Sequence, residues 1–171
     1  MDQSEIVRIY QALRSNPSFR RRVTHHDTKI SNVLFNSEGK GLCVIDLDTV
    51  MPGYFISDLG DMMRTYLSPV GEEEKDFSAI TVRPQFYSAI VQGYQTEMKE
   101  ELTPEEKQYF FYSGQFMTYM QALRFLTDHL QRDFYYGARY PGHNLARAGN
   151  QFTLLQQLNR KKPELEQLVK S

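Results

Sequence analysis

The sequence has few of the features that mark several common protein classes. It contains a single cysteine, Cys43, which excludes an intrachain disulfide framework and is typical of a reducing compartment. Its 20 Lys and Arg residues are balanced by 21 Asp and Glu residues, so it lacks the positive charge that is typical of a nucleic-acid binder. The longest uncharged run, residues 108–123, carries Gln, Ser, Gly and Thr, and we expect no transmembrane span.

The amino-terminal residues lack the apolar segment of a signal peptide, because charges at Asp2, Glu5 and Arg8 interrupt them. We therefore expect a cytoplasmic protein that binds neither nucleic acid nor membrane. What the sequence does have is a globular composition, since 40% of its 171 residues are hydrophobic and 24% are charged. This length can bury a sizeable core, and we expect one domain over residues 1–171.

Hydrophobic periodicity predicts a mainly helical chain with one β-hairpin, an α+β fold class. The hairpin consists of two short apolar strands, residues 32–35 and 42–45, joined by a glycine-containing turn. Ser57 is expected to cap a helix, and Thr103 with its following Pro and Glu residues is a strong helix start. Helices are expected over residues 4–15, 58–67, 86–98, 103–131 and 144–160, with a short last helix from Pro163 and loops over residues 68–82 and 134–142.

One segment, residues 25–48, carries side chains suited to phosphoryl transfer. That reaction needs a carboxylate that orients the attacking hydroxyl, oxygen ligands for Mg²⁺ and a cation that offsets charge on the transferred group. Asp27 and Asn32 lie at the two ends of a short loop, and Lys29 lies between them. The predicted hairpin returns the chain so that Asp46 can lie beside Asn32. We therefore expect three oxygen-bearing side chains around one space the size of a metal ion.

The spacing of these residues resembles the catalytic loop of the protein-kinase-like superfamily. The run from His25 to Asn32 (HHDTKISN) follows the H-R-D-L-K-x-x-N spacing, and Asp46 follows Asn32 by fourteen residues. The H-x-D form, the IDLDT run and the absence of a D-F-G motif resemble the small-molecule branch, which holds aminoglycoside phosphotransferases, choline kinases and sugar kinases. Within that branch, residues 45–53 (IDLDTVMPG) look most like the N-acetylhexosamine 1-kinases, and so do the later NLAR and QF runs.

The resemblance implies a role for each residue of the motif. Asp27 resembles the catalytic base that positions the acceptor hydroxyl, and Lys29 resembles the lysine that approaches the γ-phosphate of ATP. His25 resembles the histidine that braces the catalytic loop through hydrogen bonds. Asn32 and Asp46 resemble the ligands of Mg²⁺.

Three further carboxylates follow the motif, and the motif itself begins with two adjacent histidines. Asp48 lies two residues past Asp46 and could serve a second ion or its water shell, while Asp58 resembles the helix-start carboxylate that ties down the catalytic loop. A purely structural role for Asp48 and for Asp61 stays open. The paired histidines at positions 25–26 are not expected to form a zinc site, because no third His or Cys follows at ligand spacing.

The acceptor is expected to bind against the later helices, as the resemblance to sugar kinases implies. Arg124 lies in an otherwise apolar run (YMQALRFL), where a charge needs a partner or a ligand. We expect Arg124 and Tyr136 to contact the acceptor. The alternatives are an ion pair between Arg124 and Asp128 within the helix, and core filling by Tyr136. His143 and Arg147 are further candidates.

The resemblance implies Mg²⁺-dependent transfer of the γ-phosphoryl group of ATP to a small-molecule hydroxyl, with the anomeric hydroxyl of an N-acetylhexosamine as first choice. The same chemistry on choline, an aminoglycoside or another amino-alcohol stays open, as does a non-catalytic module. Only 24 residues precede His25 and no G-x-G-x-x-G motif is present, so the chain resembles a carboxy-terminal lobe without the amino-terminal nucleotide lobe. We expect low activity from such a lobe alone, and self-association through the apolar surface left by the missing lobe.

Overall fold

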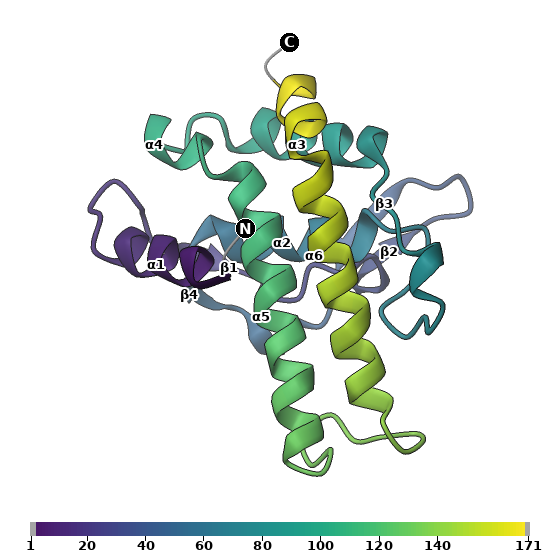
Figure 1. Cartoon of the computed structure of the whole chain (residues 1–171). Helices are drawn as coiled ribbons and strands as arrows, with labels where there is room; N and C mark the ends of the chain where they lie inside the picture. The colour runs from purple at the N-terminus through teal and green to yellow at the C-terminus, as the bar shows by residue number, and fades with distance from the viewer. Residues whose placement is uncertain (1–2, 170–171) are drawn as a thin grey trace.

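Helices make up most of the computed structural model, which describes residues 3–169 (Figure 1). Two long antiparallel helices, α5 and α6, lie side by side, with α3 and α4 across one end and α1 beside α5 (Figure 1). The mainly α, α+β class expected from periodicity is confirmed. The elements are α1 (Gln3–Arg14), β1 (Arg22–Thr24), β2 (Val33–Phe35), β3 (Gly41–Val44), β4 (Met51–Gly53), α2 (Phe55–Tyr66), α3 (Pro84–Met98), α4 (Pro104–Lys107), α5 (Phe110–Leu130) and α6 (His143–Leu168), with 3₁₀ turns at Ile30–Asn32, Leu47–Thr49 and Phe77–Ala79.

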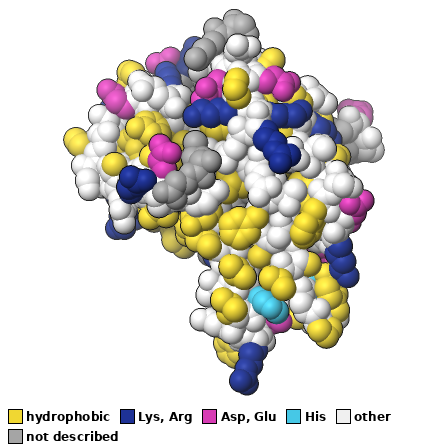
Figure 2. Space-filling model, viewed as in Figure 1, with side chains coloured by type: hydrophobic (Ala, Val, Ile, Leu, Met, Phe, Trp, Pro, Cys, Tyr) yellow, Lys and Arg dark blue, Asp and Glu magenta, His cyan; other side chains and the backbone are white. Residues whose placement is uncertain are grey.

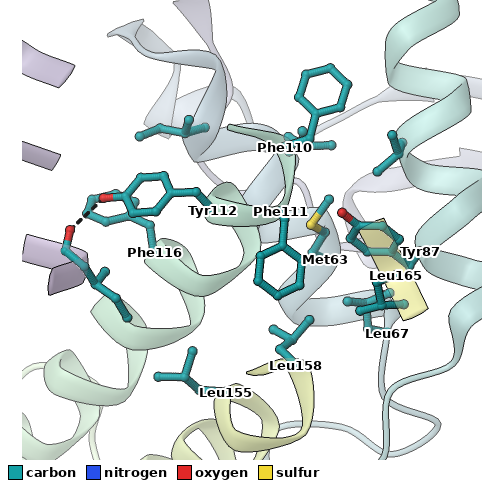
Figure 3. Packing of buried hydrophobic residues seen from close by; sticks show 14 of the residues in the cluster. Met63, Leu67, Tyr87, Phe110, Phe111, Tyr112, Phe116, Leu155, Leu158 and Leu165 are labelled. Carbon is teal, nitrogen blue, oxygen red and sulfur yellow. Dashed lines mark hydrogen bonds between the residues drawn. The ribbon is translucent and has the colours of Figure 1, made fainter. Parts of the chain in front are cut away.

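The core forms where α2 packs against α5 and where α5 packs against α6. Met63 on α2, Phe111 on α5 and Leu158 on α6 are buried in one cluster, which Figure 3 shows from close by. At the α2–α5 contact the backbones approach closely, because a Cβ on Gly60 would lie 2.2 Å from the carbonyl oxygen of Ser113. Only glycine therefore allows α2 to lie this close to α5.

The aromatic residues of α5 also fix α1 in place. The Tyr112 hydroxyl donates a hydrogen bond to the Ile6 carbonyl at 2.8 Å, drawn as a dashed line in Figure 3. The Tyr10 ring stacks on the Phe116 ring at a centroid distance of 4.4 Å. On the face shown in Figure 2, hydrophobic side chains gather over the part of the α5–α6 pair that projects below α1. From residue 3 to residue 169, no helix has both the length and the apolar character needed to cross a bilayer.

Two small antiparallel sheets hold the loop that carries the motif. The expected hairpin is present as β2–β3, with Val33 opposite Val44. A second pair, β1–β4, places Arg22 opposite Gly53 and was not predicted. Its strands are three residues long and one contains Pro52, so neither shows the alternation of polar and apolar residues that indicates a strand.

Helix starts differ from the prediction at two places. Ser57 is not an N-cap, because α2 begins at Phe55 with Tyr54 as its N-cap, and the Ser57 hydroxyl contacts a histidine instead. The helix expected over residues 103–131 is divided into α4 and α5 by Tyr109, which leaves helical geometry at φ −105° and ψ 15°. Thr103 does cap α4, and Glu106 completes the capping box as expected.

The last helix is longer than expected. A break was predicted between residue 160 and Pro163, yet α6 continues through Pro163 to Leu168. Leu158 and Leu165 are fully buried on either side of the proline. Packing of both leucines therefore outweighs the backbone hydrogen bond that a proline removes from a helix.

Candidate active site

Asp27 lies at the centre of the loop between β1 and β2. Its Oδ2 accepts hydrogen bonds from Lys29 Nζ at 2.7 Å and from Asn32 Nδ2 at 2.9 Å. Asn32 Nδ2 also donates to the Asp27 carbonyl oxygen at 2.8 Å, so Asn32 holds both the backbone and the side chain of Asp27. Asp46 Oδ2 lies 4.0 Å from Lys29 Nζ. The structure thus brings together Asp27, Lys29, Asn32 and Asp46.

These contacts set the charge of the loop. Burial alone would raise the pKa of Asp27, but hydrogen bonds from Lys29 and Asn32, together with the Lys29 charge, hold that pKa below its ordinary value. The hydrogen bond to Asp27 raises the pKa of Lys29. At neutral pH Asp27 is therefore an ionised carboxylate beside a charged lysine, and it can accept a hydrogen bond from a hydroxyl group.

Asp58 anchors the backbone of the loop. Its Oδ2 accepts from the His25 N–H at 3.0 Å, and its Oδ1 accepts from the His26 N–H at 2.8 Å. The Thr28 hydroxyl donates to the Asp58 carbonyl at 2.7 Å. His26 has a left-handed backbone with φ 67°, a conformation that persists only where the surroundings hold it. The side chain of Asp58, in the first turn of α2, provides this restraint.

His25 connects the loop to the end of the hairpin. Its Nδ1 accepts from the Asp27 N–H at 3.3 Å, so the neutral ring carries its proton on Nε2, which donates to the Ile45 carbonyl at 3.0 Å. Ile45 directly precedes Asp46, whose backbone is left-handed at φ 63°. The His25 ring therefore connects the backbone of Asp27 to the backbone of Ile45, the residue before Asp46.

His26 has a structural place that the sequence did not indicate. Its Nε2 lies 2.6 Å from the Thr24 hydroxyl and its Nδ1 lies 2.6 Å from the Ser57 hydroxyl. Since Thr24 donates its own proton to the Met51 carbonyl, the His26 Nε2–H must donate to Thr24. A Cβ on Gly53 would lie 2.5 Å from the His26 ring, so glycine is required beside it. His26 thus joins the loop to the β1–β4 pair.

The residues present fit a magnesium ion that is completed by other ligands. The Asn32 amide nitrogen is engaged with Asp27, which leaves its Oδ1 for a cation, and the Asp46 side chain is 45% exposed. Mg²⁺ commonly takes one or two protein oxygens and completes its shell with phosphate and water. Asp48 is exposed on the turn Leu47–Thr49. Within the described chain, no three His, Cys, Asp or Glu side chains form a metal-binding group, so Asp48 does not complete one with Asp27 and Asp46.

A cavity of about 570 Å³ opens beside the loop. Asp27 and Lys29 line one part of it, and Arg124, Tyr136 and Arg147 from α5, the following loop and α6 line another. The expected acceptor residues Arg124 and Tyr136 therefore share a cavity with the loop. A volume of this size accommodates a small organic molecule.

Arg124 is not paired with Asp128. Asp128 is buried and instead accepts from the backbone N–H groups of Tyr135 and Tyr136, at 2.7 and 3.0 Å, and from Asn144. The Arg124 guanidinium lies 5.5 Å from the Tyr136 ring centroid. The Tyr136 ring also packs edge-on against the buried Phe125 at 5.0 Å, so it belongs to the cavity wall and to the core at once. His143 is buried at the start of α6 and does not line the cavity.

A buried ion-pair network forms a further part of the cavity wall. Asp61 accepts from Arg64 Nε at 2.8 Å, Arg64 Nη1 lies 2.5 Å from Glu72 Oε2, and Glu72 Oε1 pairs with Arg147. Burial raises the pKa of Asp61 although the Arg64 charge opposes the rise. Burial would also raise the pKa of Glu72, but the charges of Arg64 and Arg147 hold it below its ordinary value. Glu72 thus fixes the loop after α2 against both α2 and α6.

The sequence showed only part of this network. Residues 68–82 were correctly expected to be a loop, but the acidic run gives no sign that Glu72 turns inward while Glu73 stays exposed. Asn150 provides a second attachment for this loop, since its Nδ2 donates to the Gly71 and Glu74 carbonyls at 3.0 and 3.1 Å. The spacing of Asp61 and Arg64 on one helix was the only available signal.

The helical lobe, with its loop and hairpin, has the fold of a kinase-like phosphotransferase. Residues 2–104 match the model of the phosphotransferase enzyme family, known as APH, which covers more than half of the chain. The chain therefore belongs to this family. The matched segment contains the loop, the hairpin, α2 and α3, whereas α5 and α6 lie beyond it. Membership thus supports phosphotransferase chemistry, while the acceptor has to be inferred from the cavity.

Proposed function

We propose that this chain is the catalytic and acceptor-binding lobe of a Mg²⁺- and ATP-dependent kinase of small molecules. The observation that carries this proposal is the ionised Asp27 on the wall of a cavity of about 570 Å³, with Lys29, Asn32 and Asp46 gathered around it. Most of the rate enhancement in phosphoryl transfer comes from positioning and from electrostatic stabilisation. The fixed loop supplies both.

In this reaction Asp27 accepts a hydrogen bond from the acceptor hydroxyl and directs its oxygen at the γ-phosphorus. A bond forms between that oxygen and phosphorus, the bond to the ADP leaving group breaks, and the hydroxyl proton passes to Asp27 and then to solvent. Lys29 offsets negative charge on the transferred group. Mg²⁺, held by Asn32 Oδ1 and Asp46, would neutralise charge on the β- and γ-phosphates. His25 and Asp58 keep the loop in place through the contacts described above.

The charges of the cavity favour a neutral acceptor. Each of the three carboxylates on its wall already has a basic partner. Arg124 is left as a cation without a carboxylate partner among residues 3–169, so the cavity disfavours choline, aminoglycosides and other cationic acceptors. We infer that the acceptor is a neutral sugar, with the anomeric hydroxyl of an N-acetylhexosamine as first choice. The pairs are Asp27–Lys29, Asp61–Arg64 and Glu72–Arg147.

A ³¹P NMR assay tests the proposal. The chain is incubated with Mg·ATP and an N-acetylhexosamine, beside the Asp27→Asn variant, choline and an aminoglycoside. We expect a sugar-1-phosphate signal whose rate of appearance falls at least about 100-fold in Asp27→Asn, because an amide cannot take the proton. Circular dichroism should show both proteins folded. If folded wild-type protein phosphorylates none of these acceptors, the chain is not a kinase on its own; transfer to choline alone would contradict the choice of a neutral sugar.

A further inference from the structure

Two buried polar atoms on the α6 wall of the cavity have no hydrogen-bond partner in the part of the chain that the structure describes. They are Arg147 Nε, a donor, and Gln151 Oε1, an acceptor. Gln151 is 1% exposed, and the Arg147 side chain is 12% exposed. Both residues line the cavity, and because they are four positions apart they lie on one face of α6. Buried polar atoms in proteins are nearly always paired, so a molecule in the cavity that pairs with both atoms would be favoured.

The Arg147 guanidinium is held by contacts that leave Nε unused. Nη1 donates to Asn144 Oδ1 at 3.0 Å, and Nη2 pairs with Glu72. The face of the guanidinium lies over the Phe125 ring at 3.8 Å from the centroid. The side chain is therefore rigid before any ligand arrives, which lowers the entropic cost of using Nε for recognition.

The orientation of the Gln151 amide follows from its neighbour. Asn150 Nδ2 donates to the carbonyls of Gly71 and Glu74, so Asn150 Oδ1 must act as an acceptor. Gln151 Nε2 donates a hydrogen bond to this Asn150 Oδ1 at 3.1 Å. The remaining atom, Oε1, is thereby fixed as the acceptor without a protein partner. The α6 wall thus offers one fixed donor and one fixed acceptor.

We propose that Arg147 and Gln151 select for an acetamido group on the acceptor. Arg147 Nε–H donates to the amide carbonyl, and Gln151 Oε1 accepts from the amide N–H. A secondary amide has its acceptor and its donor on separate atoms, so one such group can offer an oxygen to Arg147 Nε and an N–H to Gln151 Oε1. Choline has no group that could satisfy either atom besides the hydroxyl that reacts. This proposal rests on the proposed function and adds the residues that determine its specificity.

Isothermal titration calorimetry without ATP tests the assignment on the full chain. N-acetylglucosamine and glucose are titrated into the wild type, Gln151→Met and Thr118→Val. We expect Gln151→Met to weaken binding of N-acetylglucosamine about tenfold and to leave glucose binding unchanged, because one neutral hydrogen bond is lost. Thr118→Val is the matched control: Thr118 Oγ1 is also buried without a partner among the described residues, but Thr118 does not line the cavity. It should leave the affinity for both sugars unchanged.

The outcomes separate this assignment from the proposed function. An equal loss for both sugars in Gln151→Met, or no loss for either, overturns the amide assignment. If the variant fails to fold, the wild-type order decides instead: N-acetylglucosamine must bind about tenfold more tightly than glucose and glucosamine, and equal affinities overturn the proposal. Phosphorylation of glucose and N-acetylglucosamine at equal efficiency keeps the kinase and removes the acetamido selectivity. Absence of both sugar binding and phosphoryl transfer contradicts the proposed function itself.

Discussion

Glu106 is a fully buried carboxylate that links α4 to the strand leading into the catalytic loop. Its oxygens accept from the Arg20 N–H at 2.9 Å, from Arg22 at 2.7 and 2.8 Å, and from the Thr103 N–H at 2.9 Å. Burial would raise the pKa of Glu106, but the Arg22 hydrogen bond and the two backbone donors hold it below its ordinary value. One side chain therefore caps a helix and fixes the start of β1.

We expect Glu106→Gln to lower the free energy of unfolding at pH 7 by about 3 kcal/mol, because it leaves the Arg22 charge without its partner. The native pKa of Glu106 lies below its ordinary value of 4.5, so this stabilisation is fully present above that pH. It is lost as the pH falls through the native pKa. The difference between variant and wild type in urea denaturation should therefore shrink in acid.

Glu105→Gln serves as the control for this measurement. Glu105 lies in the same short helix but is exposed, so its replacement should change the stability by less than about 0.5 kcal/mol at either pH. A difference between Glu106→Gln and wild type that stays constant down to pH 3 would refute the linkage to Glu106 ionisation.

At the residue scale, the sequence was informative where the chemistry is local. Asp27, Lys29 and Asn32 lie within six residues of one another, so their spacing alone predicted that they would meet. The pairing of Glu72 with Arg147 joins residues 75 positions apart. That contact depends on the path of a loop, for which the sequence has no periodic signal.

The contact between α2 and α5 depends on Gly60, and its replacement tests the packing of these two helices. We expect Gly60→Ala to lower the free energy of unfolding by about 1–3 kcal/mol, because the new methyl group would lie 2.2 Å from the Ser113 carbonyl oxygen and would force the helices apart. Thermal denaturation followed by circular dichroism measures the change.

Gly93 is the matched control on α3. A Cβ at Gly93 meets no atom within 4 Å, so Gly93→Ala should stabilise the protein by up to about 1 kcal/mol through helix propensity alone. Equal effects of the two substitutions would show that the close approach at Gly60 does not limit the packing of α2.

At the element scale, the long helices were predictable because their apolar residues repeat at helical spacing. The β2–β3 hairpin was predictable because two apolar runs flank a glycine-containing turn. The β1–β4 pair was missed because its strands, RVT and MPG, contain no run of apolar residues that would indicate a strand. The continuation of α6 through Pro163 was missed for another reason. The rule that proline ends a helix is local, whereas the burial of Leu158 and Leu165 is a tertiary effect.

Over the whole molecule, exposed apolar side chains concentrate around the loop and the two small sheets. Val23, Leu42 and Leu47 are 78%, 63% and 60% exposed. We expect this surface to drive self-association, with a sedimentation coefficient that rises with protein concentration. Leu42→Glu should reduce the association, whereas Leu145→Glu, an exposed leucine on α6, should not. A strictly monomeric profile at high concentration would contradict this expectation.

The β1–β4 pair closes residues 25–50 into a segment that is tied at its base. A second tie lies further along, where the Ile45 N–H donates to the Asn32 carbonyl at 2.9 Å. The turn over residues 36–40 lies at the tip of the hairpin, beyond both of these connections. Insertions in this turn can therefore lengthen the hairpin tip while Asp27 and Asp46 stay where they are. Changes at the hairpin tip therefore leave the positions of the site residues unchanged. This makes the turn a suitable attachment point for a peptide tag or a fluorescent reporter.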